Sequence, residues 1–264
     1  MIMTLQRIFR PAPAGASCED SATRLALCSA HASHVGRRRS SNQDVVLHRP
    51  DLATWSVFDG MGGTSAGDVA ARIACQATAD TLEATVDLPG PSRLRGALAH
   101  AAARVYQEAQ NHWAWRGMGT TAVLCHVEPS GVFHVAHIGD SRAYLLHGQT
   151  WIALTRDHSV LQDLIDQGRI HQDAARRHPM QNVLSRSLGH HPEVSPDIAS
   201  RAMAIGDRIL LCSDGLTSYA SDAEICRVLM RRRDPQIAVD ALIKLALHGG
   251  GGDNVSVVVI DRVA

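Results

Sequence analysis

Short apolar runs separated by glycine and polar turns dominate the chain and predict a protein built mainly on β-strands. The runs that we interpret as strands cover residues 25–29, 44–48, 54–58, 122–127, 132–138, 143–146, 151–154, 207–212 and 255–260. They are rich in Val, Ile and Leu, and several neighbours are joined by short turns of the hairpin kind. Consecutive strands joined in this way favour a largely antiparallel sheet over parallel βαβ units.

Apolar residues at helical spacing predict helices in two separate pairs. The expected starts are Ser65, Ser92, Ser221 and Pro235. Ser65-Ala-Gly-Asp68 and Ser221-Asp-Ala-Glu224 are both capping-box patterns, and a glycine run from 249 to 252 ends the last helix. Strands grouped apart from two helix pairs indicate an α+β layered fold.

Two stretches lack this periodicity. Residues 1–22, which contain Pro11 and Pro13, predict a flexible N-terminal segment, and one domain follows from 23 to 264. Residues 156–192 are polar and contain one short amphipathic run that begins at Val160. We expect this second stretch to be a mobile surface flap near the functional site.

Four aspartates stand beside glycine at the ends of apolar runs, namely Asp59, Asp140, Asp214 and Asp253. A carboxylate at the end of a buried strand cannot stay ionised cheaply unless it is paired or bound to a cation. Glycine lets the backbone approach closely, so that a carbonyl oxygen can join the carboxylates around magnesium or manganese. One Asp-Gly pair is usually an ordinary turn. Four of them favour a shared site for a hard metal ion.

Composition narrows the possible functions. Lys plus Arg and Asp plus Glu each total 26 of the 264 residues, so no global field attracts nucleic acid. The six cysteines form no C-x-x-C pair, which indicates free thiols in a reducing, cytoplasmic compartment. We expect no export signal, no membrane span, and no zinc site at His31-x-x-His34 or His190-His191.

Eight motifs along the chain resemble those of the metal-dependent serine/threonine protein phosphatases of type 2C, in the bacterial form. They are Arg39-Ser-Ser-Asn-Gln-Asp44, Phe58-Asp-Gly-Met-Gly-Gly63, Gly117-Met-Gly-Thr-Thr121, Ile138-Gly-Asp-Ser-Arg142, Thr155-Arg-Asp-His-Ser159, Asn182-Val-Leu-Ser-Arg-Ser-Leu-Gly189, Ser213-Asp-Gly-Leu216 and Gly252-Asp-Asn254. The resemblance covers about residues 23 to 262 and is far more specific than a lone glycine-rich loop. It implies an αββα sandwich, in which helix pairs flank two packed, largely antiparallel sheets with metals bound between the sheets at one end.

The resemblance also implies roles for particular residues. Asp59 would bridge two Mn²⁺ or Mg²⁺ ions, and Gly60 would contribute its carbonyl oxygen. Asp214 and Asp253 would complete the shell of one ion, and Asp44 would hold coordinated water nearby. Two cations roughly 3.5–4 Å apart lower the pKa of a shared water and neutralise the phosphate, so that a bridging hydroxide attacks in line.

Three further assignments follow from the same motifs. Asp140, together with Asp214, would help to hold a third, weaker ion. Arg39 would act in catalysis as the clamp on the substrate phosphate, because a guanidinium can bind two phosphate oxygens in one plane. Arg37 and Arg38 are more simply a solvated basic strip.

The sequence does not identify the residue that donates a proton to the leaving oxygen. Eukaryotic members of the family carry a histidine directly after the Asp-Gly pair, whereas this chain has Met61. His48, His137 and His158 are candidates by their position in the sequence, and each could equally be structural.

The sequence thus predicts a phosphatase that removes phosphate from serine and threonine on proteins. We expect a monomer that reverses a bacterial kinase and binds neither nucleic acid nor membrane. One alternative is a phosphatase-like regulatory module that binds phosphoprotein without turnover. Such a module would lack a metal aspartate, and all are present. A two-metal nuclease is a second alternative, but aromatic residues make up only 4% of the chain.

Overall fold

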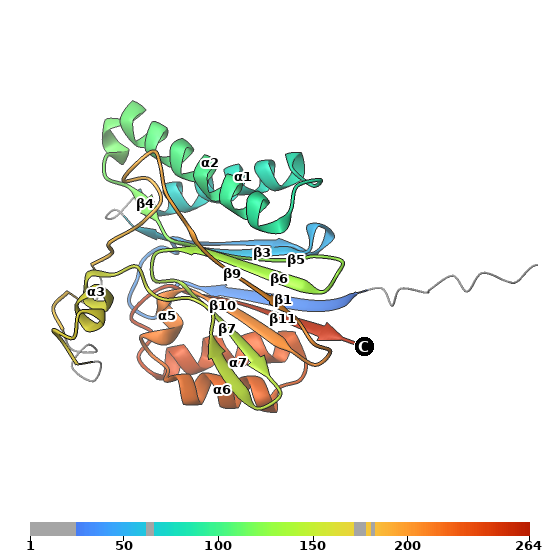
Figure 1. Cartoon of the computed structure of the whole chain (residues 1–264). Helices are drawn as coiled ribbons and strands as arrows, with labels where there is room; N and C mark the ends of the chain where they lie inside the picture. The colour runs from blue at the N-terminus through green and yellow to red at the C-terminus, as the bar shows by residue number, and fades with distance from the viewer. Residues whose placement is uncertain (1–24, 62–65, 172–177, 181–182) are drawn as a thin grey trace, which may run out of the picture.

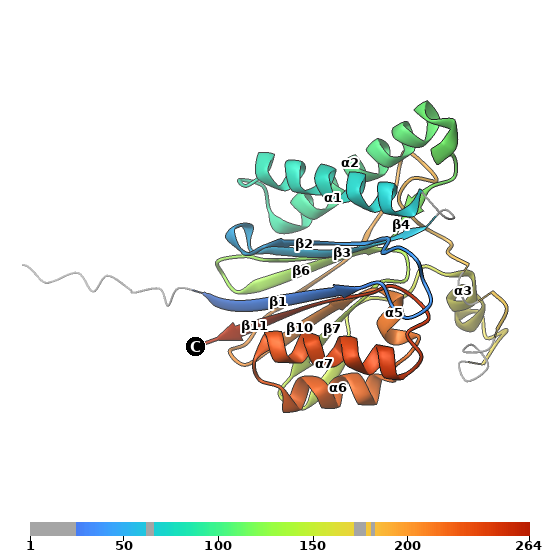
Figure 2. The same cartoon turned by 180° about the vertical axis from the view of Figure 1, so that it is seen from behind.

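The computed structural model describes residues 25–61, 66–171, 178–180 and 183–264. Within them, two β-sheets stack face to face and helices cover the two outer faces (Figure 1; Figure 2). The predicted αββα sandwich is therefore confirmed. No helix of this part of the chain is both long and apolar enough to cross a membrane.

The first sheet has the strand order β2-β3-β5-β6-β9, with β4 paired to β3 off this path. Its strands are β2 (Asp44–Arg49), β3 (Thr54–Met61), β4 (Gly119–Thr120), β5 (Ala122–Val127), β6 (Val132–Ile138) and β9 (Asp197–Ala202). All neighbours run antiparallel, as the short turns predicted. The predictions did not include β4 or β9.

The second sheet has the strand order β1-β11-β10-β7-β8. Its strands are β1 (Ala26–His34), β7 (Arg142–His147), β8 (Thr150–Ala153), β10 (Arg208–Cys212) and β11 (Val255–Val263). These pairs are antiparallel too, so the two ends of the described chain lie on neighbouring strands, β1 and β11.

The predicted helix pairs are present on opposite sides of the sandwich (Figure 1). The main helices are α1 (Gly67–Ala84) and α2 (Gly90–Asn111) over the first sheet, and α6 (Asp222–Arg231) and α7 (Pro235–His248) over the second. The short elements are α3 (Val160–Asp166), α5 (Asp214–Thr217) and the 3₁₀ turns Pro50–Leu52 and Trp113–Trp115.

Helix starts show where the sequence patterns were right and wrong. Ser221 and Glu224 form the predicted capping box at α6. At α1, however, the residue before the helix is Ala66, which makes no side-chain cap bond, and Ser65 lies outside the described residues. The second helix starts at Gly90 rather than Ser92, because proline is tolerated in the first turn, where its missing N–H needs no partner.

Three apolar clusters fill the spaces between the four layers. One lies between α1, α2 and the first sheet, and another between α6, α7 and the second. The third lies between the two sheets and contains Trp55, Val57, Phe133, Leu145 and Val258, which are almost fully buried. This inner cluster sets the distance between the two sheets.

Candidate metal centre

The aspartates singled out in the sequence meet at one end of the sandwich, and both sheets contribute. Asp44 and Asp59 stand opposite each other in register on β2 and β3. Asp140 follows β6, Asp214 opens α5 after β10, and Asp253 precedes β11. A cavity of about 360 Å³ is lined by residues that include Arg39, Asp59, Gly60, Asp140, Asp214 and Asp253. Asp44 is buried behind them.

Burial and mutual repulsion make four of these side chains, those of Asp44, Asp59, Asp140 and Asp214, weaker acids than a free aspartate. Burial is the main cause that raises the pKa of Asp44 to about 7, of Asp140 to about 8 and of Asp214 to about 6. The pKa of Asp59 is raised well above its ordinary value by burial and then by the charge of Asp44 and of the other three aspartates. Carboxylates gathered in this way need cations near them, and their oxygens suit Mg²⁺ or Mn²⁺.

The two carboxylate oxygens of Asp44 differ in their hydrogen bonding. Its Oδ2 accepts a 2.8 Å hydrogen bond from the hydroxyl of Ser213, and the backbone N–H of Ser256 in turn donates to that hydroxyl at 2.9 Å. The other oxygen, Oδ1, is buried and has no hydrogen-bond partner of good geometry among the described residues. A buried carboxylate oxygen without a partner is costly. It fits a hydrated metal ion, because the coordinated water would supply the missing donor.

Asp59 is held by two threonines that the sequence reasoning did not single out. Its N–H donates to Thr121 Oγ1 at 3.2 Å, and its carbonyl accepts from Thr120 Oγ1 and from the N–H of Thr121, both at 2.9 Å. The Gly117-Met-Gly-Thr-Thr121 motif contained this signal. At Gly60 a Cβ atom would collide with the carbonyl oxygen of Gly67, so only glycine fits beside Asp59.

Arg39 lies at the mouth of the cavity, with its side chain about half exposed. Its Nη2 donates to Asp253 Oδ2 at 2.7 Å, and this bond raises the pKa of the guanidinium. Asn254, a residue without a predicted role, fixes the loop that carries Arg39. Its side chain accepts from the N–H of Gln43 and donates to the carbonyls of Val35 and Ser41.

None of the three candidate proton donors is among the described residues that line the cavity. His48 bonds to Ser29 Oγ at 3.0 Å. His137 Nε2 donates to the carbonyl of Arg156 at 2.7 Å, and His158 Nδ1 accepts from the N–H of Gly139 at 3.2 Å. These bonds favour the structural interpretation for all three histidines.

His137, His158 and Asp197 bring possible ligand atoms within 4.8 Å of one another. The two rings are stacked, with centroids 4.4 Å apart and planes tilted by 24°. Because His158 Nδ1 already accepts a hydrogen bond, a neutral ring carries its proton on Nε2, which lies 3.2 Å from Asp197 Oδ2. One ring nitrogen of each histidine is thus already bonded to the backbone, and His158 Nε2 makes no hydrogen bond of good geometry among the described residues.

Two packed sheets that both contribute carboxylates to a cavity at their common end define the class of metal-dependent protein phosphatases. The model of the family described as Protein phosphatase 2C matches residues 22–255, and the chain belongs to this family. It is an enzyme of this class, as the sequence predicted.

The relatives are bacterial phosphatases. The chain is 34% identical over 238 residues to the protein phosphatase PhpP of Streptococcus pneumoniae, covering 86% of this chain and 94% of PhpP. It is 38% identical over 246 residues to the serine/threonine protein phosphatase PstP of Mycobacterium tuberculosis, covering 90% of this chain but 46% of PstP. A crystal structure of the catalytic domain of PstP with two manganese ions aligns with a TM-score of 0.80 at 34% identity, covering 90% of this chain and 99% of that domain.

Proposed function

We propose that this enzyme hydrolyses phosphoserine and phosphothreonine on proteins and reverses the action of a bacterial serine/threonine kinase. The observation that carries this proposal is the convergence of four aspartates on one cavity, with Asp44 buried opposite Asp59 and a guanidinium at the mouth of the cavity. Carboxylates hold the cations that a phosphate dianion requires, and a guanidinium recognises the phosphate itself.

We assign two cations to the cavity and place a third beside them. Asp59 would hold both of the first two ions, the Gly60 carbonyl would contribute a further oxygen ligand, and Asp214 and Asp253 would complete the shell of one ion. Asp140 and Asp214 would hold the third, weaker ion. The ions, manganese or magnesium, activate water as the nucleophile and neutralise the phosphate charge when they are bound.

The side chains of the protein orient this chemistry. Asp44 would offer its buried Oδ1 as the acceptor for a water on the bound ions, while Ser213 fixes the other oxygen. Arg39 would exchange its bond with Asp253 for two phosphate oxygens of the substrate. Its half-exposed side chain has room for this movement. No covalent phosphoenzyme is required.

The physiological setting is part of the proposal. A cytoplasmic location agrees with the free cysteines, because five of them lie within the described residues and none forms a disulfide there. The equal numbers of acidic and basic residues agree with a protein substrate rather than nucleic acid. We propose a monomer that acts in signalling beside its kinase.

Chelation tests the proposed function directly. A phosphothreonine peptide should not be hydrolysed after treatment with excess EDTA, and added manganese or magnesium should restore turnover, since the proposed ligands are all hard oxygen atoms. A phosphodiester serves as the control substrate and should remain intact throughout. Full activity in excess chelator would exclude the metal mechanism. Peptide binding without turnover in manganese would favour the regulatory module.

A further inference from the structure

Beyond the end of β8, the chain stays alongside the turn that carries Asp140. The N–H of Leu154 donates to the carbonyl of Ala143 at 2.8 Å, and the N–H of Ala143 donates to Thr155 Oγ1 at 3.0 Å. Further along, the N–H of His158 donates to the carbonyl of Gly139 at 2.9 Å. Residues 154–158 therefore lie alongside residues 139–143. One of the hydrogen bonds that join the two segments is accepted by a side chain, that of Thr155, rather than by the backbone.

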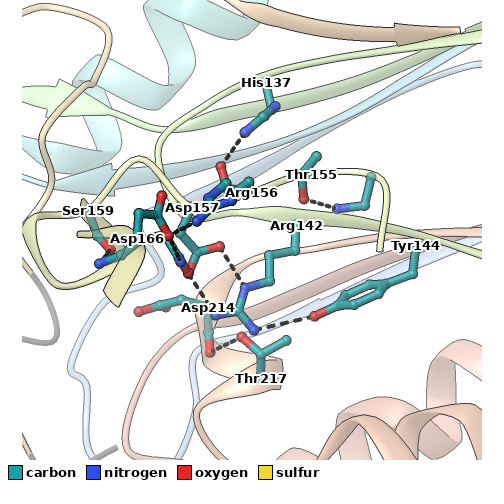
Figure 3. A network of polar contacts seen from close by, with 12 residues as sticks. His137, Arg142, Tyr144, Thr155, Arg156, Asp157, Ser159, Asp166, Asp214 and Thr217 are labelled. Atoms are coloured by element: carbon teal, nitrogen blue, oxygen red, sulfur yellow. Dashed lines mark hydrogen bonds and ion pairs between the residues drawn. The ribbon is translucent and has the colours of Figure 1, made fainter. Parts of the chain in front are cut away.

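An ion pair between Arg142 and Asp157 also joins these two segments, close in sequence to Asp140. Arg142 Nε donates to Asp157 Oδ1 at 2.8 Å and Nη2 donates to Oδ2 at 2.6 Å, which is the planar two-bond geometry (Figure 3). Arg142 Nη1 also reaches the hydroxyl of Tyr144 at 3.3 Å. The side chain of Asp157 is only 14% exposed, so solvent screens the pair weakly.

The contact fixes where the next helix begins. Ser159 follows directly and caps α3, because its hydroxyl accepts from the N–H of Gln162 at 3.1 Å. Leu161 and Ile165 of α3 line a second cavity of about 680 Å³, and Asp140 and Asp214 line it as well. The helix is thus a wall of the space that adjoins the metal centre, and its position depends on residues 155–158.

We propose that Asp157 is a positioning residue, which through Arg142 sets α3 at a fixed distance from Asp140 and thereby determines how a phosphorylated protein segment is accepted. The inference rests on the proposed function, because it concerns protein substrates of the same site. A protein segment extends beyond the phosphate and would contact the wall formed by α3. A small aryl phosphate occupies only the cavity around the aspartates.

The test compares Asp157→Asn with the wild type in manganese, using a phosphothreonine peptide and p-nitrophenyl phosphate. The variant should have a kcat/KM for the peptide lower by on the order of tenfold, mainly because KM rises. A tenfold loss is the low end of what removal of a supporting contact costs. Hydrolysis of the aryl phosphate should change by less than about twofold. Trypsin should also cleave the metal-free variant after the exposed Arg169 faster than it cleaves the wild type.

The chain offers a matched control in the same sheet. Arg208 and Asp261 form a buried ion pair with the same two-bond geometry, at 2.6 and 2.5 Å, between β10 and β11. Asp261→Asn should lower the melting temperature without changing the ratio of the two activities or the cleavage after Arg169. Asp157→Glu, which keeps the charge, should recover part of the peptide activity.

Two results would overturn the inference: an unchanged activity ratio and cleavage rate in Asp157→Asn, or an equal loss of ratio in Asp261→Asn. If Asp157→Asn does not fold, Arg142→Lys supplies the comparison, since lysine keeps the charge but cannot bind both oxygens in one plane. If the wild type does not hydrolyse the peptide at all, the proposed function fails. The trypsin comparison then still decides whether Asp157 positions α3.

Discussion

Asp44→Asn should stabilise the metal-free protein at alkaline pH and destabilise the protein in manganese. Burial raises the pKa of Asp44 to about 7 from 3.8 in an unfolded chain. The folded protein therefore binds this proton more tightly than the unfolded chain does. The stability that the protonated form provides is present at low pH and is lost as the pH rises from about 4 through about 7.

The shift of about 3 pKa units corresponds to roughly 4 kcal/mol at about pH 8, at 1.36 kcal/mol per unit. Asparagine removes this cost because it carries no charge, and its oxygen can still accept from Ser213. Its amide nitrogen would occupy the position of the unpartnered Oδ1, which costs about 1–3 kcal/mol. The net gain is about 1–3 kcal/mol, or a rise in melting temperature of roughly 2–10 °C.

Thermal melts followed by circular dichroism, in EDTA at about pH 5 and about pH 8, would measure this effect. The advantage of Asp44→Asn should shrink at the lower pH. Saturating manganese should reverse the order, because a nearby cation favours the charged carboxylate. Asp87→Asn, at an exposed position, is the control and should not respond to metal or pH in this way. A metal-free variant less stable than the wild type at about pH 8 would refute the reasoning.

Two further predictions concern catalysis. Asp59→Asn and Asp214→Asn should each reduce phosphopeptide hydrolysis by more than the 10–100-fold that is typical of outer partners, with an unchanged circular dichroism spectrum; near-normal turnover in either variant would show that the centre is misplaced. Arg39→Ala should raise KM for the phosphopeptide more than it lowers kcat, because the guanidinium contacts the phosphate already in the ground state. The opposite pattern in steady-state kinetics would assign Arg39 to the transition state.

The strands and helices were predictable where burial produces a regular pattern of apolar residues in the sequence. The strands with a continuous apolar run, such as β5, β6 and β10, were predicted at or within one residue of their bounds. β9 was missed because Asp197–Ala202 has only one large apolar residue, Ile198. It is an edge strand of exposed or half-buried residues. Its extended conformation is stabilised by pairing with β6 rather than by the strand propensity of its own residues.

The sequence singled out Asp59, Asp214 and Asp253 because a charge beside a buried strand is unusual, and the structure brings all three to one cavity. Their roles as metal ligands stay a prediction. Thr121 and Asn254 were not singled out, although each fixes the backbone of a neighbour, because Thr and Asn are common in turns and carry no charge. Their roles depend on which segments meet in space, and that is decided by the packing of the two sheets.

The division of the aspartates between two sheets has a mechanical consequence. Asp44 and Asp59 lie on strands of the first sheet, Asp214 and Asp253 adjoin strands of the second, and Asp140 lies on the turn that joins the two sheets. Sliding of one sheet over the other would stretch or compress the space between the ligands. The side chains packed between the two sheets, Trp55 and Val258 among them, would therefore set the distance between the proposed ligands of the two sheets. Substitutions that repack this interior would therefore lower the rate of hydrolysis even though every proposed ligand is unchanged.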